Sequence, residues 1–213
     1  MIYPQVARSA YEVNSSRLII RTAIDSDTES FHKLLTTAEN FPFEEPEKGL
    51  TIEKLRARIG RFAESTAQGK NAFMVVILHE TNQLIGYGGY NTFESAEPAE
   101  FLRETTLEPG QKKMTDIGIV LDHKYWRKGY GLELVSVLVE FARLELGCEL
   151  FRAETGNDNE PWRALMRAAG LAEFEGKHKA SYDANQDVWV WMFDSGHWEQ
   201  AKTKMQAEGK WLL

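Results

Sequence analysis

Met-Thr-Asp-Ile-Gly-Ile-Val-Leu-Asp-His-Lys-Tyr-Trp-Arg-Lys-Gly-Tyr-Gly-Leu-Glu-Leu, residues 114–134, is the stretch that decides the fold. A mostly apolar run from Ile117 to Leu121 stops at an Asp-His pair, and a turn with two glycines, Gly129 and Gly131, then precedes a long helical pattern. A strand that enters a helix through a glycine turn leaves several backbone N–H groups unpaired at one point, where the helix dipole adds partial positive charge. The stretch therefore predicts a site for a phosphate or a pyrophosphate.

Segments with strand and helix patterns alternate on both sides of this stretch. Strands are expected at 17–22, 72–78, 84–90, 115–121, 150–154, 172–177 and 187–193. Helices are expected from Asp25 or Asp27 to about 38, after a Thr51 cap, at 130–146, at 160–169, and from about 197 to 208. Residues 92–113 are largely polar and contain two prolines, which predicts an excursion between two strands. The alternation predicts a mixed α/β sheet with helices packed on it.

The composition narrows the class of protein. A chain of 213 residues fits one large domain or a domain with an appendage. The 32 acidic and 25 basic residues argue against nonspecific binding to nucleic acid or to an anionic membrane, and suit a cationic substrate such as an amine. The single cysteine, Cys148, builds no intramolecular disulfide, and the five histidines lack metal-ligand spacing. We therefore expect no metal, no membrane span and a cytoplasmic location, with the nucleus not excluded.

Two common phosphate-binding loops are excluded by the residues themselves. The dinucleotide-binding fingerprint fails because Leu134 occupies its third glycine position, and the P-loop fails because no Gly-Lys-[Ser/Thr] follows the glycines. A tight connection without any ligand stays open as an alternative on this pattern alone.

The run from Trp126 to Gly131, Trp-Arg-Lys-Gly-Tyr-Gly, resembles the acyl-CoA pyrophosphate loop of the GNAT N-acetyltransferase superfamily. Together with the preceding strand it is most similar to the branch that acetylates ribosomal-protein N-termini, although Arg127 stands where that branch usually has glycine. A second segment, Asn159-Glu-Pro-Trp162, is similar to the Asn-x-x-Ser motif of the same branch. Both motifs stand at the expected spacing and in the expected order of elements.

The resemblance implies a fold and a division of the chain. The fold is the GNAT acyltransferase fold, whose central and mostly antiparallel sheet is splayed at the cofactor strand and carries helices on both faces. The acetyltransferase domain is expected over residues 16–194. Residues 1–15 are then an N-terminal extension, and residues 195–213 a C-terminal helical extension.

The resemblance also implies that acetyl-CoA is the cosubstrate. Ile119, Val120 and Leu121 are expected to pair with the pantetheine arm through their main chain, and Asn159 to bond the cofactor, to cap its helix, or both. Glu133 is expected to point away from the bound phosphates. The remaining expected cofactor contacts lie in the glycine turn: Trp126, Arg127, Lys128, Gly129, Tyr130, Gly131 and Leu132. For Arg127 and Lys128, a role as solvated surface cations is an equally good interpretation.

Catalytic residues are harder to assign. Asp116 matches the position of the branch's strand carboxylate and is the first candidate for general base, with a structural carboxylate as the alternative. The tyrosine that many superfamily members use as general acid is missing, since Met166 stands where it would fall. Either Tyr90 or Tyr182 protonates the leaving thiolate, or the reaction needs no dedicated acid. Trp162 replaces the smaller serine of the motif.

We therefore expect an acetyl-CoA-dependent N-acetyltransferase that moves an acetyl group directly to a primary amine, either a protein N-terminus or a small amine. One alternative is an acyl-CoA-binding or regulatory protein of the same fold without transfer activity, and another is a nucleotide-binding enzyme that uses the same turn. Glu44 and Glu45 either attract the amine or form a solvated acidic loop. The acceptor and the possibility of a homodimer stay open.

Overall fold

The computed structural model describes residues 5–43 and 46–213, so Glu44 and Glu45 lie outside the described residues. The strands are β1 (Glu12–Asn14), β2 (Leu18–Thr22), β3 (Ala72–Leu78), β4 (Gln83–Ala96), β5 (Lys112–Leu121), β6 (Leu150–Thr155), β7 (Glu175–Lys179) and β8 (Asp187–Asp194). The α-helices are α1 (Thr28–Thr36), α2 (Ile52–Ala67), α3 (Pro98–Phe101), α4 (Tyr130–Leu144), α5 (Glu160–Ala168) and α6 (Ser195–Ala207). Short 3-10 turns occur at Asp25–Asp27, Ala38–Asn40, His123–Tyr125 and Ala172–Phe174.

Within the described residues, the eight strands form one sheet in the order β1-β2-β3-β4-β5-β6-β8-β7. Every neighbouring pair is antiparallel except β5 and β6, which run parallel. A parallel pair needs a long crossover, and α4 provides it between these two strands. The predicted mixed sheet is confirmed, and its single parallel step falls at the stretch that suggested the fold.

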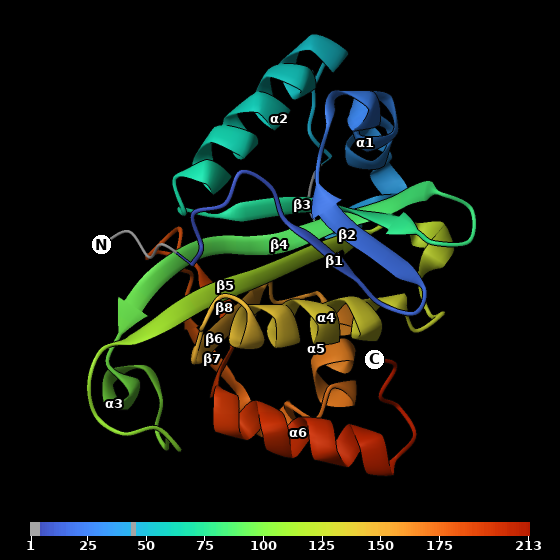
Figure 1. Cartoon of the computed structure of the whole chain (residues 1–213). Helices are drawn as coiled ribbons and strands as arrows, with labels where there is room; N and C mark the ends of the chain where they lie inside the picture. The colour runs from blue at the N-terminus through green and yellow to red at the C-terminus, as the bar shows by residue number, and fades with distance from the viewer. Residues whose placement is uncertain (1–4, 44–45) are drawn as a thin grey trace.

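Helices cover both faces of the sheet, with α1 and α2 on one side and α4, α5 and α6 on the other (Figure 1). The side chains of β3 show why both faces must be covered. Met74 and Val76 pack into the core beneath α4, whereas Val75 and Ile77 pack into a second core with α1 and α2. A strand buried on both faces reads as an unbroken apolar run, as residues 72–78 do.

The predicted polar excursion at 92–113 is corrected by the structure. Strand β4 continues to Ala96 and β5 begins at Lys112, and the two pair along this length, from Thr92 opposite Asp116 to Ala96 opposite Lys112. The outer part of the β4–β5 hairpin is only partly covered, so its exposed positions carry polar side chains. In the sequence, such a polar run resembles a loop. Only the part from 97 to 111, which includes α3, connects the strands.

Two smaller differences concern the end strands. The strand expected at 172–177 begins at Glu175, because a 3-10 turn occupies Ala172–Phe174. The first strand, β1, was not expected, and it pairs with β2 at the edge of the sheet.

At the C-terminal end of the chain, Trp198 and Met205 of α6 are buried in the main core. The segments expected as extensions therefore contribute to the same sheet and core as the rest of the chain.

Candidate functional site

The parallel strands β5 and β6 separate after a short paired segment. Met114–Asp116 pair with Leu150–Arg152, but β5 continues to Leu121 and β6 to Thr155 without further pairing. Alternate residues of β5 direct their backbone groups away from β4, and at Ile119 and Leu121 these groups have no strand partner among the described residues. This opening is the predicted splay. Because the two strands are parallel, α4 and α5, which follow them, begin at the same edge of the sheet.

The segment from the end of β5 through the first residues of α4, residues 122–132, is called the glycine loop. It starts with a 3-10 turn that the Asp122 side chain caps by accepting from the Lys124 N–H. The Trp126 indole N–H then donates to the Leu121 carbonyl over 2.8 Å. Arg127 has φ +58° and Gly129 has φ +83°, so the backbone enters the left-handed region twice. Glycine adopts that region without strain, which explains why the resembled branch has glycine where this chain has Arg127.

The glycine loop presents unpaired amides at the start of α4. The first hydrogen bond of the helix runs from the Glu133 N–H to the Gly129 carbonyl, so the N–H groups of residues 129–132 have no helical partner. A Cβ at Gly131 would lie 3.3 Å from the Leu165 side chain of α5, which shows how closely the two helices approach here. Four free amides and the helix dipole suit an anion at this point.

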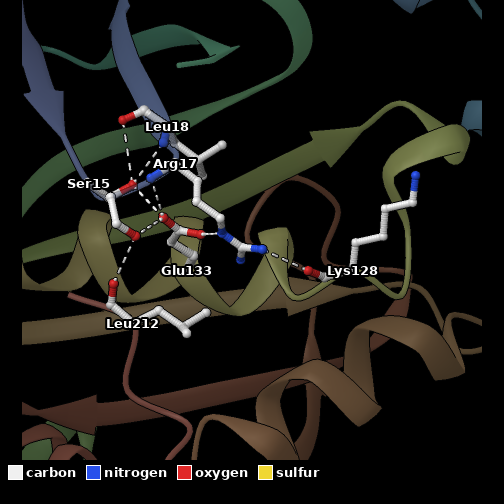
Figure 2. A network of polar contacts seen from close by, with 7 residues as sticks. Ser15, Arg17, Leu18, Lys128, Glu133 and Leu212 are labelled. Carbon is white, nitrogen blue, oxygen red and sulfur yellow. Dashed lines mark hydrogen bonds and ion pairs between the residues drawn. The ribbon is translucent and has the colours of Figure 1, made fainter. Parts of the chain in front are cut away.

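Charged side chains flank these amides in different ways. Arg127 and Lys128 are exposed, and the Lys128 ammonium lies 5.3 Å from the centre of the Tyr125 ring. Glu133, in the first turn of α4, is fully buried. Its carboxylate accepts hydrogen bonds from the residues that precede β2, as Figure 2 shows, so it points away from the free amides as expected.

Asn159 lies between β6 and α5 and caps the helix. Its carbonyl oxygen accepts from the Trp162 N–H over 3.1 Å, and its amide nitrogen donates to the Thr155 hydroxyl over 2.8 Å. The amide carries two hydrogens, so one stays available for a ligand. Further along α5, Met166 is buried in the core, and the partly buried Trp162 has an indole N–H without an acceptor in the described part of the chain.

Asp116 lies where β5 and β6 separate, and with Asn91 and Arg152 it forms what is called the apex cluster. One carboxylate oxygen of Asp116 accepts from the Asn91 amide over 2.9 Å, and the other accepts from Arg152 Nε over 2.6 Å. The register shifts by one residue at Asn91, and this bulge brings its side chain to the carboxylate. Burial raises the pKa of Asp116 above its usual value, while the Arg152 guanidinium opposes that rise.

The two tyrosines considered as proton donors lie in different surroundings. Tyr90 is fully buried, its hydroxyl donates to the Leu138 carbonyl of α4 over 2.7 Å, and burial raises its pKa well above the ordinary value. Its proton is held in the core beneath α4, and this geometry gives no support to a role in proton transfer. Tyr182 is 69% exposed, in the loop between β7 and β8.

Several residues of the site were missed by sequence reasoning. Arg17, Asn91 and Arg152 each contact the glycine loop or Asp116 from a distant part of the chain. Asn40 is another, since its side-chain oxygen accepts from the His123 N–H and joins the segment after α1 to the glycine loop. None lies in a local motif, because the pairing of the strands and the 3-10 turn after α1 bring each of them to the site from a distant part of the chain.

Two absences concern the part of the chain that the structure describes. No group of three or more His, Cys, Asp or Glu side chains there has the arrangement that a metal ion needs. In the same ranges, 5–43 and 46–213, no helix has the length and apolar character required to cross a bilayer.

Comparison with known proteins gives concordant results. The family described as the acetyltransferase (GNAT) domain matches residues 17–172. The uncharacterized N-acetyltransferase YoaA of Bacillus subtilis is 22% identical over 179 residues, which cover 81% of this chain and 93% of that protein. The structure of Mycobacterium smegmatis RimJ in complex with a CoA disulfide has a TM-score of 0.72 at 14% identity, covering 98% of both chains. A GNAT-family acetyltransferase of Bacillus anthracis has a TM-score of 0.64 at 20% identity, covering 86% of this chain and 98% of that one.

Proposed function

Because the chain belongs to the GNAT acetyltransferase family, we propose that it transfers an acetyl group from acetyl-CoA directly to a primary amine. One observation carries the proposal: the free amides at the start of α4 lie next to the opened side of β5. A diphosphate and an extended, amide-containing arm are the two parts of coenzyme A that such a pair of features would hold.

The residues that would hold acetyl-CoA follow from this arrangement. The amides of residues 129–132 would bind the diphosphate, with Arg127 and Lys128 adding positive charge near the loop. Ile119 would pair with the pantetheine arm through its main chain, because its backbone groups face away from β4. Val120 directs its carbonyl toward Gly86 of β4, and the Leu121 carbonyl is already engaged by Trp126, so only the Leu121 N–H is left on the open side. The second amide hydrogen of Asn159 would meet the arm from α5. When bound, acetyl-CoA would supply a thioester carbonyl for a neutral amine to attack: a C–N bond forms, the C–S bond breaks, and the proton that the nitrogen loses ends on the departing thiolate.

The apex cluster bears on the kind of amine. The ammonium form of a primary amine must lose a proton before it can attack, and Asp116 is an inefficient direct base for this step because Asn91 and Arg152 occupy both its oxygens. An α-amine is on the order of 10% neutral at pH 7, whereas a lysine amine is well under 0.1% neutral. We therefore favour acceptors whose amine is partly neutral without help, such as the N-terminus of a peptide. That Asp116 acts as base stays a prediction.

A free-thiol assay tests the proposal. The protein is incubated with acetyl-CoA and a panel of amines: peptides with free N-termini, the same peptides with blocked N-termini and a free lysine, polyamines, and amino sugars. Thiol release with the free N-termini, and much less with the blocked peptides, is the expected result. Failure of acetyl-CoA and CoA to bind at high micromolar concentration, measured by calorimetry, would refute the donor assignment.

A second function, acyl-CoA binding without transfer, is favoured by α5. Met166 stands where many relatives carry a tyrosine, and Trp162 is bulkier than the serine of the resembled motif. Such a protein would bind acetyl-CoA in the calorimeter yet release no thiol with any amine of the panel. Turnover with a single amine rejects this alternative.

A further inference from the structure

Arg17, just before β2, connects the glycine loop to the body of α4. Its Nη1 donates to the Lys128 carbonyl over 3.0 Å, and its Nε donates to the Glu133 carboxylate over 2.6 Å. Its backbone N–H donates to the other oxygen of Glu133 over 3.1 Å. Figure 2 shows the guanidinium between the carboxylate on α4 and the carbonyl in the loop. One side chain thus ties the loop to the helix that follows it.

The bond to Lys128 determines where the next amide points. The C=O and N–H groups of a trans peptide point in opposite directions, and no cis peptide bond occurs in the described residues. Because the Lys128 carbonyl points to Arg17, the Gly129 N–H points away from it. Gly129 provides the first of the free amides at the start of α4. The contact therefore sets the direction of an amide that is available to an anion.

The loop needs such a restraint. Arg127 has φ +58°, a strained conformation for a non-glycine residue, which persists only when its surroundings hold it. A contact one residue further on, at Lys128, holds it. The Arg17 guanidinium also lies 4.3 Å from the centre of the Tyr130 ring, so it packs against the first residue of α4.

Charge balance shows what Arg17 does not do. Glu133 is fully buried and would repel a bound phosphate, and the Arg17 guanidinium compensates this carboxylate, which also accepts from the Ser15 hydroxyl over 2.7 Å. The pair is close to neutral, so its net electrostatic attraction for an anion is small. The remaining guanidinium nitrogen, Nη2, is buried without a hydrogen-bond partner in the described ranges. Its place beneath the loop is fixed by the contacts of Nε and Nη1.

We propose that Arg17 is a positioning residue for the donor: it holds the glycine loop in the conformation that binds the diphosphate of acetyl-CoA, without touching the substrate. This inference rests on the proposed function. It goes beyond it by assigning diphosphate recognition to a residue outside the loop, 111 positions before Lys128. Removing Arg17 should therefore impair donors that carry the diphosphate and spare donors that lack it.

The experiment compares acetyl-CoA with S-acetylpantetheine, which has no phosphate, in the wild type and in Arg17→Gln. The expected result is a fall of about 10- to 100-fold in kcat/KM for acetyl-CoA, mainly through KM, because a displaced loop loses aligned donors. For S-acetylpantetheine the change should stay within about threefold. Equal losses with both donors would mean a general structural role, and no loss with either would also overturn the proposal.

Arg21→Gln is the matched control. Arg21 lies on β2 and also binds a largely buried carboxylate, that of Asp27, over 2.7 Å, but it contacts no residue of the glycine loop. It should lose stability and keep the wild-type ratio between the two donors. Arg17→Lys is the second variant if Arg17→Gln does not fold. It keeps the charge beside Glu133 but lacks the planar guanidinium that reaches two acceptors. The ratio of kcat/KM for acetyl-CoA to kcat/KM for S-acetylpantetheine should therefore fall as well. A wild type that uses neither donor would refute the proposed function itself, a result distinct from all of these.

Discussion

The glycine loop and the apex cluster lie at the two ends of the opened segment of β5, and they differ in the groups that form them: backbone amides in the loop and side chains in the cluster. The loop offers backbone amides from consecutive residues, 129–132, and a side chain at Gly129 or Gly131 would obstruct access to them. The apex cluster is made of side chains from three strands, β4, β5 and β6, that are consecutive across the sheet but distant along the chain. A short sequence motif therefore predicts the glycine loop, whereas no local motif predicts the apex cluster.

The difference also concerns what each region tolerates. In the glycine loop, a larger side chain is expected to impair binding, because it would fill the space that a bound phosphate would occupy. In the apex cluster, loss of one partner is expected to destabilise the fold, because it leaves a buried charge uncompensated. Substitutions in the loop should therefore act on donor binding, and substitutions at the apex on stability first.

Gly131→Val should have the largest effect on binding. Loss of two charge-assisted hydrogen bonds, at about 1.5 kcal/mol each, weakens acetyl-CoA binding by roughly 100-fold or more. The fold should survive, since the nearest atom to the new Cβ is the end of a leucine side chain, 3.3 Å away at Leu165. Calorimetric titration with acetyl-CoA measures the effect. Gly60→Val in α2 is the control, because nothing lies within 4 Å of a Cβ there, and its affinity should be unchanged.

Asp116→Ala should have the largest effect on stability. It leaves Arg152 beside the empty carboxylate position, and breaking such a buried pair costs about 3 kcal/mol or more. Urea unfolding measures the loss. The double variant Asp116→Ala, Arg152→Ala should cost less than the sum of the two single variants, because it leaves no unpaired charge. Strict additivity would show that the two residues do not act as a pair.

The same carboxylate gives a kinetic test of the contrast. Asp116→Asn keeps the shape of the side chain, so kcat with a peptide α-amine should stay within about tenfold of the wild type. A fall of about 100-fold or more would instead assign the carboxylate as general base.

Asp194 shows what a buried carboxylate does when it lies away from both regions. It caps α6 and accepts from Thr105, from the Thr106 N–H and from the His197 N–H. Asp194→Ala should cost about 2 kcal/mol and leave kcat/KM for acetyl-CoA unchanged. Asp25→Ala is the control, because that side chain is 73% exposed and its pairing contributes little.

The stabilisation by Asp194 should also depend on pH. Burial opposes ionisation, but the hydrogen bonds from His197 and Thr106 outweigh it and hold the pKa of Asp194 below its ordinary value of 3.8. A carboxyl with a lowered pKa in the folded state stabilises the fold above its ordinary pKa, and this contribution disappears as the pH falls through the folded pKa. The difference in Tm between wild type and Asp194→Ala should therefore shrink below about pH 4. A constant difference down to pH 2 would contradict this assignment.

Cys148→Ala should have the smallest effect. The thiol is buried, and burial raises its pKa to about 12, so it is not a nucleophile at neutral pH. Its removal should change kcat by less than about twofold. Mass spectrometry of the wild type after incubation with acetyl-CoA should find no acetylated cysteine. An acetylated Cys148 would overturn direct transfer.

Prediction from the sequence succeeded where the signal is local. The strand from Ile117 to Leu121, the glycine turn and the helix after it are confirmed, as are the caps at Thr51 and Asn159, because each depends on residues a few positions apart. The family prediction is confirmed by the match over residues 17–172. The hairpin extension of β4 and β5 was missed, since polar residues on a half-covered strand resemble those of a loop.

The sequence by itself determined the backbone of the proposed donor site, because a glycine turn that leads into a helix depends only on residues a few positions apart. The tertiary structure decided how that site is held and what surrounds the reacting end. Arg17 reaches Lys128 and Glu133 only because β2 lies near the start of α4, and Asn91 and Arg152 meet Asp116 only because three strands are adjacent. Contacts between side chains far apart in the chain depend on the packing of the whole sheet, so no local pattern specifies them.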